Sequence, residues 1–191
     1  MAPGISTSTS PTAHLSFFDR DSDGIISPWD TYVGLRKLHW GIFLSVLGMA
    51  IIHGGFAYFT QPRIIPDPLF RIHSSGISGA IHGSTTNGYA PNGDFVPVNF
   101  DRTFKLYSSL ADKNGLTIYD TIRMVNQQRC ALDFFGTFAA VFEWFATWMV
   151  LWPLTGKGSW STLVIRKDDV QGIFDGTVFY RVAGEDIPEH L

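Results

Sequence analysis

A short stretch near the start of the chain, residues 17–30, has the residue types and spacing of a cation site. It reads FFDRDSDGIISPWD, with three aspartates at alternate positions before a glycine. In an EF-hand loop such carboxylates surround a hard cation, the glycine makes a sharp turn, and the next residue offers its backbone carbonyl. The pattern therefore predicts one calcium site, with these candidate ligands: Asp19, Asp21, Asp23, the carbonyl of Ile25, Ser27 and Asp30.

The loop departs from the usual EF-hand in ways that affect its affinity and its pairing. Pro28 is unusual at its position in the loop. Asp30 replaces a glutamate that would bind through both oxygens, and this weakens the affinity for calcium and narrows the selectivity for calcium over magnesium. EF-hands pair through a short β-bridge, here at Ile26, and we expect the partner to be ADKNGLTIYD or STLVIRK. Neither segment carries a full ligand set, so we predict one metal ion and a second, metal-free hand-like loop.

An uncharged run follows the loop. Residues 41–59, GIFLSVLGMAIIHGGFAYF, contain no Asp, Glu, Lys or Arg, and their length approaches the roughly 20 residues that cross a bilayer core. Glycines and His53 argue against a clean span, and we expect His53 to face a partner or an internal cavity. Three prolines then forbid regular helix: Pro62, Pro66 and Pro68. We expect a membrane-associated apolar helix or hairpin followed by a proline knot.

The remaining elements are predicted to be mainly helical. A Gly/Ser/Asn-rich stretch, residues 71–100, indicates loop, and FDRTFKLYSSLA and TIYDTIRMVNQQR indicate helices. The segment ALDFFGTFAAVFEWFATWMVLWPL is apolar nearly all round, interrupted only by Asp133 and Glu143, so this helix is either buried or faces lipid. A short strand in STLVIRK and a terminal helix in DDVQGIFDGTVFYRV complete the prediction.

Composition excludes some classes of protein. Charged residues make up 16% of the 191 and aromatic residues 15%, against roughly 25% charged in an average soluble domain. A net charge of -3 leaves no basic stripe for nucleic acid, so no nucleic-acid partner is expected. The single cysteine, Cys130, excludes an intramolecular disulfide framework, and the polar start lacks the pattern of a signal peptide. We therefore expect an intracellular chain with a disordered arm over residues 1–13.

Taken in order, a calcium hand, an uncharged run, a proline knot and a His-Gly-Ser loop resemble the caleosin family. The resemblance covers residues 14 to about 180. It rests on HLSFFDRDSDGIISPWDTYVGLR, QPRIIPDPLF, HGSTTNGYAPNGDFVPVNF, FEW and GIFDGTVF. The chain departs from the family in lacking the long plant-type N-terminal extension and in carrying Arg71 where the knot would end in proline. The resemblance implies a lipid-droplet or endoplasmic-reticulum membrane location and, since several members are haem-dependent peroxygenases, haem b beside Ca²⁺.

The resemblance also implies which histidines matter. Family members need one histidine just before the calcium loop and one that opens the His-Gly-Ser motif, and these positions match His14 and His82. One would be the proximal haem ligand and the other distal or supporting. Calcium would fix the segment that holds His14, and Gly83 would let the backbone approach a flat cofactor. Cys130 could instead supply a thiolate, although a small buried cysteine is the commoner role.

A peroxygenase transfers one oxygen from a hydroperoxide to a second molecule. Glu143 is a carboxylate on an otherwise apolar helix, where burial would favour its protonated form, so it is our candidate distal acid/base. The aromatic side chains of residues 134–152 are candidate walls of a channel. The family implies a fatty-acid hydroperoxide as donor and an unsaturated fatty acid, or another apolar molecule, as acceptor of epoxidation, hydroxylation or sulfoxidation.

Two other functions fit the same sequence. A non-enzymatic, calcium-dependent coat protein of lipid droplets would need the apolar run, the knot and the hand, but not the two histidines. A haem enzyme that tailors a specialised metabolite would share the cofactor and prefer another acceptor. In each case we expect one domain, residues 14–191, in which an EF-hand region (14–40) and an apolar membrane-associated segment (41–70) precede a helical haem-binding and substrate region (71–191). Exposed apolar surface would favour self-association without lipid.

Overall fold

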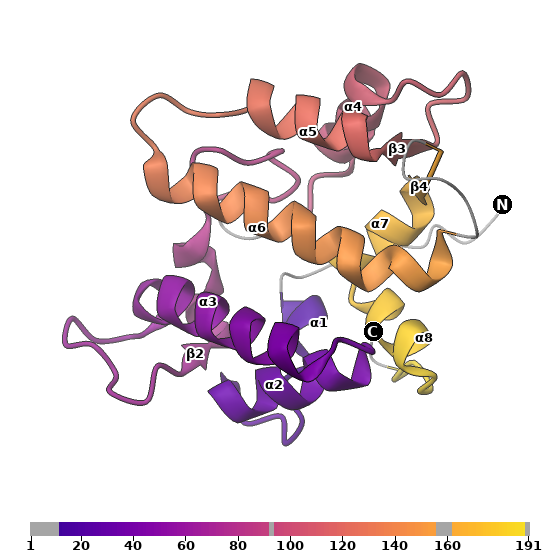
Figure 1. Ribbon diagram of the computed structural model, residues 1–191. Helices are drawn as coiled ribbons and strands as arrows, with labels where there is room; N and C mark the ends of the chain where they lie inside the picture. Colours follow the sequence, from indigo (N-terminus) through magenta and orange to yellow (C-terminus); the bar gives the residue numbers. More distant parts are fainter. Residues whose placement is uncertain (1–11, 92–93, 156–161, 190–191) are drawn as a thin grey trace, which may run out of the picture.

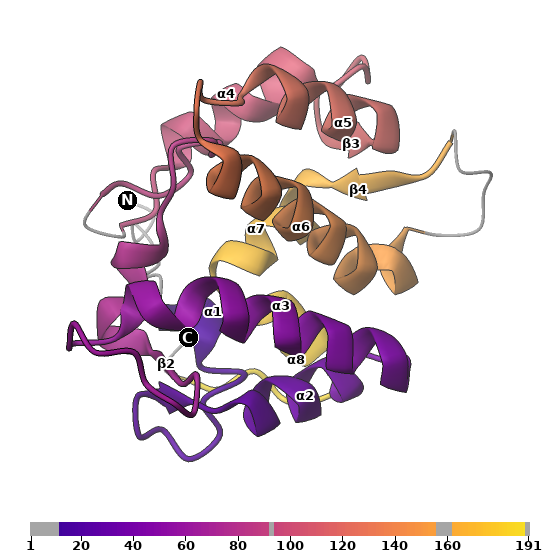
Figure 2. The same ribbon diagram turned by 60° about the vertical axis from the view of Figure 1, so that its left-hand side comes forward.

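The structure, a computed structural model, describes residues 12–91, 94–155 and 162–189. The described chain is mainly helical, as the sequence predicts, and Figures 1 and 2 show a lower and an upper group of helices. We call residues 12–80 the N-terminal lobe and residues 97–174 the C-terminal lobe. The elements are α1 (Thr12–Leu15), β1 (Ile25–Ile26), α2 (Pro28–Lys37), α3 (Ile42–Thr60), β2 (Ile72–His73), the 3₁₀ helix η1 (Ser74–Ala80), α4 (Pro97–Tyr107), β3 (Gly115–Thr117), α5 (Ile118–Gln127), α6 (Phe134–Leu151), the 3₁₀ helix η2 (Trp152–Leu154), β4 (Val164–Arg166), α7 (Lys167–Phe174) and α8 (Thr177–Ala183).

The calcium-loop strand, β1, does not pair with either of the two segments that we expected. Ile25 lies opposite His73, and Ile26 lies opposite Ile72, in an antiparallel pair. The predicted partners, ADKNGLTIYD and STLVIRK, are therefore wrong. Ile26 and Ile72 are both buried and share a small core with Ala57 of α3. Packing against the neighbouring apolar helix thus selects β2, a strand too short to stand out in the sequence.

The two segments that we had assigned to β1 pair with each other instead. β3 and β4 are antiparallel, with Leu116 opposite Ile165, and both side chains are buried. Each strand leads directly into a helix, α5 after β3 and α7 after β4, just as α2 follows β1. Both lobes therefore contain a paired strand with the strand-then-helix arrangement of an EF-hand.

The uncharged run forms one unbroken helix, α3, so the chain makes no hairpin within it. The helix ends at Thr60, and the chain turns back through residues 61–71, which we call the proline segment. One side of α3 packs on α2, β2 and η1, whereas six large side chains are 44–77% exposed: Ile42, Phe43, Val46, Leu47, Tyr58 and Phe59. In the proline segment Ile64 and Ile65 are exposed as well. Apolar surface of this extent is typical of a face that meets lipid or a partner.

Two segments of the described chain meet the length and apolarity expected of a membrane-crossing helix. They are Ile42–Thr60 and Phe134–Leu154. In the most apolar 18-residue stretch of each, 22% and 39% of the residues, respectively, are buried in the protein. Both segments also contribute side chains to the interior of the protein: Ala57 from the first and Val150 from the second are buried. Each apolar helix therefore also forms part of the packed interior of the fold.

The main core joins the two ends of the chain. Phe17, just before the calcium loop, stacks on Phe179 of α8 with ring centroids 5.7 Å apart and meets Tyr180 edge-on at 5.1 Å. The same core includes Phe104 and Met124 of the C-terminal lobe. Each large apolar side chain that is fully buried contributes about 1.5–3 kcal/mol. This shared packing holds the calcium loop against the helices of both lobes.

Two sequence boundaries differ in the structure. The predicted disordered arm, residues 1–13, lies outside the described residues except for Thr12 and Ala13, which begin α1. The predicted terminal helix is two helices, α7 and α8, because Gly176 adopts a φ of +81° between them. Glycine takes this left-handed conformation without steric cost, and the turn lets α8 fold back onto Phe17.

Candidate active site and calcium loop

Three aspartates converge in the predicted calcium loop. Side-chain oxygens of Asp19, Asp21 and Asp23 lie within 4.8 Å of one another, a spacing that suits the oxygen ligands of one hard cation. Asp19 accepts hydrogen bonds from the backbone N–H groups of Asp23, at 3.1 Å, and Gly24, at 3.0 Å. The pKa of Asp19 is raised overall, because burial and the charges of Asp23 and Asp21 outweigh the two hydrogen bonds, which lower it. A bound cation would relieve the repulsion within this cluster.

Ser27 and Asp30 bond to each other at the start of α2. Asp30 Oδ2 accepts hydrogen bonds from Ser27 Oγ at 2.5 Å and from the Ser27 backbone N–H at 3.0 Å. The Asp30 N–H in turn donates to Ser27 Oγ at 3.3 Å, which completes a capping box. The structure thus brings three of the six predicted ligands together and places these two as the cap of the following helix.

Hydrogen bonds join the calcium loop to the apolar helix through His53. Its Nδ1 lies 2.6 Å from the carbonyl of Phe70, and its Nε2 lies 2.8 Å from Oγ1 of Thr31, which follows Asp30. Since a carbonyl only accepts, Nδ1 carries the proton and Nε2 accepts from Thr31. Burial lowers the pKa of His53, although the Phe70 carbonyl and the charge of Asp30 raise it. The prediction that His53 faces an internal partner is confirmed.

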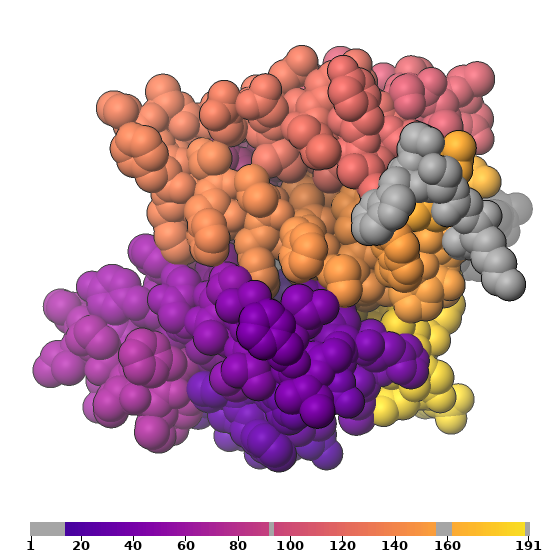
Figure 3. All heavy atoms as spheres, in the orientation of Figure 1, coloured from indigo at the N-terminus to yellow at the C-terminus, as the bar shows by residue number. Residues whose placement is uncertain are grey.

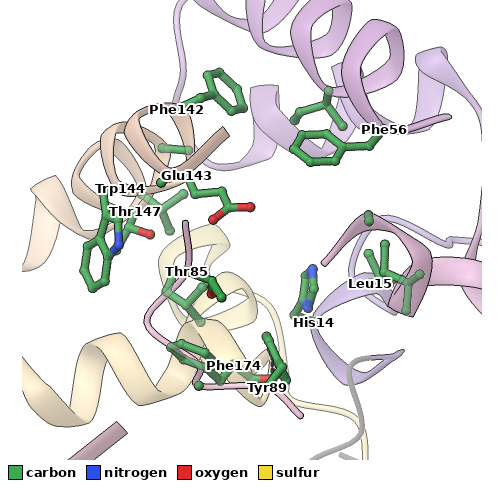
Figure 4. Close-up of a pocket in the computed structure, with 18 of the residues that line it drawn as sticks. His14, Leu15, Phe56, Thr85, Tyr89, Phe142, Glu143, Trp144, Thr147 and Phe174 are labelled. Carbon is green, nitrogen blue, oxygen red and sulfur yellow. Dashed lines mark hydrogen bonds between the residues drawn. The ribbon is translucent and has the colours of Figure 1, made fainter. Parts of the chain in front are cut away.

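A cavity of about 350 Å³ lies between the N-terminal lobe and the C-terminal lobe, and we call it the central cavity (Figure 4). Its walls are mostly apolar and come from α2, α3, α6 and α7, including Leu35, Phe56, Trp144 and Phe174. The polar side chains at its edge include His14, His82, Thr85, Tyr89 and Glu143. The two histidines that the resemblance implies, and the candidate acid/base, therefore meet at one cavity.

Only part of the predicted aromatic wall faces this cavity. Phe142 and Trp144 of α6 line it, whereas Phe134, Phe138 and Phe145 are 81%, 53% and 47% exposed. The sequence cannot separate the two sets, because α6 is apolar nearly all round and its direction is set by the elements that pack on it.

His14 enters the cavity from α1 without a polar partner. Its Nδ1 is buried and makes no hydrogen bond to the described residues, and burial lowers its pKa to about 4. The ring is therefore neutral near pH 7, which is the state that a metal ligand requires. The next residue, Leu15, accepts a 2.9 Å hydrogen bond from the backbone N–H of Asp19. The first aspartate of the calcium loop is thus tied directly to the segment that carries His14.

His82 lies beside Glu143. Its Nε2 is 3.3 Å from Glu143 Oε1, and its side chain is 8% exposed while that of Glu143 is 49% exposed. Burial lowers the pKa of His82, but the hydrogen bond and charge of Glu143 and the charge of Asp133 outweigh it and raise the pKa above its usual value. The expected burial of Glu143 is wrong, because its carboxylate reaches into the open cavity (Figure 4). The polar contact that the structure gives this carboxylate is therefore the one with His82.

The His-Gly-Ser loop is anchored on the start of α6. Asp133 Oδ2 accepts hydrogen bonds from the Ser84 backbone N–H at 2.9 Å and from Ser84 Oγ at 2.8 Å, and the N–H of Cys130 donates to Ser84 Oγ at 3.0 Å. A Cβ at Gly83 would lie 3.2 Å from Asp133 Oδ2 and 3.4 Å from Cys130 Cβ. The backbone at Gly83 therefore approaches the α5–α6 turn closely.

The sequence did not lead us to predict that Asp133 anchors this loop, because we interpreted Asp133 only as an interruption of an apolar helix. Its signal was present: an aspartate before an apolar run is a typical N-cap, and Asp133 Oδ1 does accept a 2.8 Å hydrogen bond from the N–H of Gly136. Cys130 is exposed and does not line the central cavity, so its prediction as a buried residue is wrong and it is not placed to supply a thiolate there.

Tyr89 is a second cavity residue that the sequence did not single out. Its hydroxyl donates to the Phe174 carbonyl at 3.2 Å, and burial, followed by the charges of Asp175 and Glu143, raises its pKa. Of the other histidines, His39 lies 3.2 Å from the Val182 carbonyl and His73 sits in β2; His190 is outside the described residues.

Comparisons with known proteins show what this chain is similar to. The chain matches the family model described as "Caleosin related protein" over residues 6–183. It is 36% identical over 167 residues to a "Peroxygenase" of Lilium longiflorum, covering 87% of this chain and 66% of that protein. It is 27% identical over 169 residues to "Probable peroxygenase 4" of Arabidopsis thaliana, covering 88% of this chain and 83% of that one.

No solved structure matches the chain, and the chain spans just under two thirds of the lily relative's length. The family model nonetheless extends from before the calcium loop to the end of α8. It includes the loop aspartates, the apolar helix, the proline segment and the His-Gly-Ser loop in the predicted order. This chain belongs to the caleosin family.

Proposed function

We propose that this protein is a calcium-binding haem peroxygenase that acts on apolar molecules. The observation that carries the proposal is the central cavity, where an unpartnered, neutral His14 and a His82–Glu143 pair share one mostly apolar space. The names of the lily and Arabidopsis relatives support the same activity. In the reaction a hydroperoxide ROOH gives one oxygen to an acceptor and leaves as the alcohol ROH, so no outside reductant is needed.

The side chains of the cavity fit a haem. Nδ1 atoms of His14 and His82 are buried without a hydrogen-bond partner among the described residues, and an unpaired buried polar group costs about 1–3 kcal/mol. We assign His14 as the ligand that would hold the iron, because its ring is neutral and uncommitted. His82 is less suited, because its raised pKa favours the protonated form that cannot bind a metal.

Haem bound at His14 would supply the oxygen-transfer chemistry. His82 and Glu143 would hold and move the proton that passes from one oxygen of the hydroperoxide to the other, since they share a hydrogen bond at the cavity surface. Phe56, Phe142 and Phe174 would exclude water and favour an apolar acceptor such as an unsaturated fatty acid. Epoxidation, hydroxylation and sulfoxidation are all compatible with such walls.

Calcium would act as a structural clamp on this site. The aspartate cluster that suits the ion is bonded through Asp19 to Leu15, next to His14. The helix that follows the loop, α2, is bonded to α3 through Thr31 and His53. Removing the ion would restore repulsion among the three carboxylates and loosen the segment that carries His14. We also propose that α3 and the proline segment lie on a lipid-droplet or endoplasmic-reticulum membrane surface, which their exposed apolar side chains support.

The deciding experiment is an absorption spectrum of the protein produced with ample haem. We expect a Soret band that His14→Ala abolishes and that the matched variant His39→Ala retains, since His39 lies outside the cavity. His82→Gln and Glu143→Gln should keep the band and lower epoxidation of oleic acid by a hydroperoxide about 100-fold or more. Loss of the band in His82→Gln but not in His14→Ala would reverse the two histidine roles.

A folded protein without a Soret band would refute the peroxygenase proposal. The non-enzymatic coat protein would then be the better assignment, because the apolar face of α3 and the calcium loop do not depend on haem. Turnover of a non-fatty acceptor far above that of oleic acid would instead favour the enzyme of specialised metabolism. The calcium clamp is tested on the same sample, where a chelator should weaken haem retention.

A further inference from the structure

A second apolar groove lies on the other side of α6, between α6 and α5, with a volume of about 640 Å³. We call it the α5–α6 groove. From α5 its lining side chains recur at helical spacing, and Arg129 follows just past the end of the helix: Ile118, Thr121, Ile122, Val125, Asn126 and Arg129. From α6 they are Thr137, Val141, Trp144, Phe145, Trp148 and Met149. Ile122, Val141 and Phe145 are 63%, 55% and 47% exposed, so this apolar surface is left open.

The groove is polar at one end only. Asn126, Arg129 and Thr137 lie near the turn that joins the two helices, whereas Ile118 and Met149 lie toward the other end. Inside the groove, Trp148 Nε1 donates to Thr121 Oγ1 at 3.1 Å, and that hydroxyl donates to the Thr117 carbonyl at 3.0 Å. The polar groups of the floor are therefore already bonded. What remains is an apolar trough with one charged end.

Arg129 provides that charge. Its Nε donates to the Asn126 carbonyl at 3.1 Å, and its guanidinium pairs with no carboxylate among the described residues. A guanidinium presents several N–H donors in a planar fork that matches a carboxylate. The ten residues of α5 rise by about 15 Å along the helix and Arg129 lies just beyond its end, so the trough suits a long alkyl chain.

The α5–α6 groove adjoins the central cavity. Val125 and Trp144 line both spaces, so two side chains form the wall between them. Val125 lies in the last turn of α5, four residues before Arg129 in the sequence. A chain anchored at Arg129 would therefore pass this wall before it reached the apolar end of the groove.

We propose that the α5–α6 groove binds a single-chain fatty carboxylate, with the carboxylate on Arg129 and the alkyl chain along Ile122, Val141 and Phe145. As a site that delivers substrate to the central cavity it rests on the proposed function; as a binding site it does not. Charge complementarity at one end and a continuous apolar trough select this ligand class. Arg129 is then a specificity-determining residue that discriminates free acids from their esters.

The test uses the full chain and a fluorescent polyene fatty acid, cis-parinaric acid, beside its methyl ester. Arg129→Glu should weaken binding of the acid at least tenfold, or about 1.4 kcal/mol, and leave binding of the ester unchanged. Arg129→Lys should restore most of the affinity. Lys105→Glu is the matched control, because it makes the same charge change at an exposed side chain of α4 that lines neither cavity.

A second variant fills the groove without touching the charge. Val141→Trp should weaken binding of both the acid and the ester, since it places an indole in the trough. Equal acid affinity in Arg129→Glu and Lys105→Glu would overturn the proposal, and so would full acid affinity in Val141→Trp, which would place the ligand in the central cavity. A change in sedimentation of Arg129→Glu with unchanged acid affinity would show instead that a second copy of the chain occupies the groove.

Haem content keeps this outcome separate from that of the proposed function. The Soret band should persist in all four variants, since none of the changed residues is a proposed ligand. A missing band in the unaltered protein would refute the haem assignment and leave the acid-binding result standing. A normal band with no effect of Arg129→Glu or Val141→Trp would refute the groove alone.

Discussion

The two hand-like loops of this molecule make the same turn with different side chains. Ser22 and Lys113 have φ values of +57° and +54°, and the N–H of each donates to the carbonyl three residues earlier, in Asp19 and Leu110 respectively. When the two loops are aligned on this turn, Asp21 corresponds to Asp112, and Asp23 corresponds to Asn114. The first loop therefore has an aspartate where the second has a leucine.

The loops also differ in how their last aspartate is held. Asp120 is fully buried and accepts hydrogen bonds from the N–H and Oγ of Ser109, at 3.1 and 2.9 Å, as well as from the Thr117 N–H at 3.1 Å. Lys113 closes the same loop by donating to the Ser108 carbonyl at 2.6 Å. In the second loop Oδ2 of Asp120 is fully hydrogen-bonded, although its Oδ1 has no hydrogen-bond partner among the described residues. The first loop instead brings three carboxylates close to one another, an arrangement that suits a cation.

The largest expected difference between the loops is in calcium binding. Isothermal titration should give one ion per chain, and Asp21→Ala should abolish the binding heat, because it removes a central ligand of the cluster. Asp112→Ala, the matched change in the second loop, should leave stoichiometry and affinity unchanged. Two ions per chain, or loss of binding in Asp112→Ala, would contradict the comparison.

His14, which precedes the first loop, should make the free energy of unfolding depend on pH. In the haem-free protein burial lowers the pKa of His14 to about 4, against about 6.5 in an unfolded chain. Above pH 6.5 both states are neutral and the stability is fully present. As the pH falls from 6.5 toward 4 only the unfolded chain takes up the proton, so the free energy of unfolding falls by up to about 1.4 kcal/mol per pH unit.

Urea denaturation at pH 7 and pH 5 checks this dependence. His14→Phe should lose most of the difference and keep a smaller part that comes from His53, whose pKa burial also lowers. A difference of the same size in His14→Phe and in the unaltered protein would mean that His14 is not the buried neutral group described above.

The last comparison concerns the two caps. Asp120→Ala should lower the free energy of unfolding by about 3 kcal/mol, because it removes a fully buried acceptor from the donors of Ser109 and Thr117. Asp30→Ala, measured with chelator, should cost about 1 kcal/mol, the usual value of a partly exposed cap. Equal losses would show that the second loop is no more tightly closed than the first.

Much of this protein could be predicted from local patterns. The aspartates at alternate positions, the glycine after them and the capping serine act within a few residues of one another, so the sequence was enough to predict the calcium loop. The apolar run predicted α3, since no charge interrupts it and Pro62 cannot continue the hydrogen-bond ladder. The motif order also indicated the family, and the match over residues 6–183 confirms it.

Other features depended on contacts between distant segments. The pairing of β1 with β2 follows from the burial of Ile26 and Ile72 against Ala57, and two-residue strands leave no periodicity to read. The contact of His82 with Glu143 spans 61 positions in the chain, and the nearby bond of Ser84 to Asp133 holds the His-Gly-Ser loop against the start of α6.

The sequence by itself determined that this chain carries an aspartate-rich loop with EF-hand spacing, an apolar helix and the two histidines, because each depends on residue type and short spacing. Only the tertiary structure decided which histidine stays uncommitted, which faces of α6 turn toward the central cavity and the α5–α6 groove, and which loop is left with unneutralised carboxylates. Those outcomes depend on packing between the lobes, where burial and partners far away in the chain set the state of each side chain.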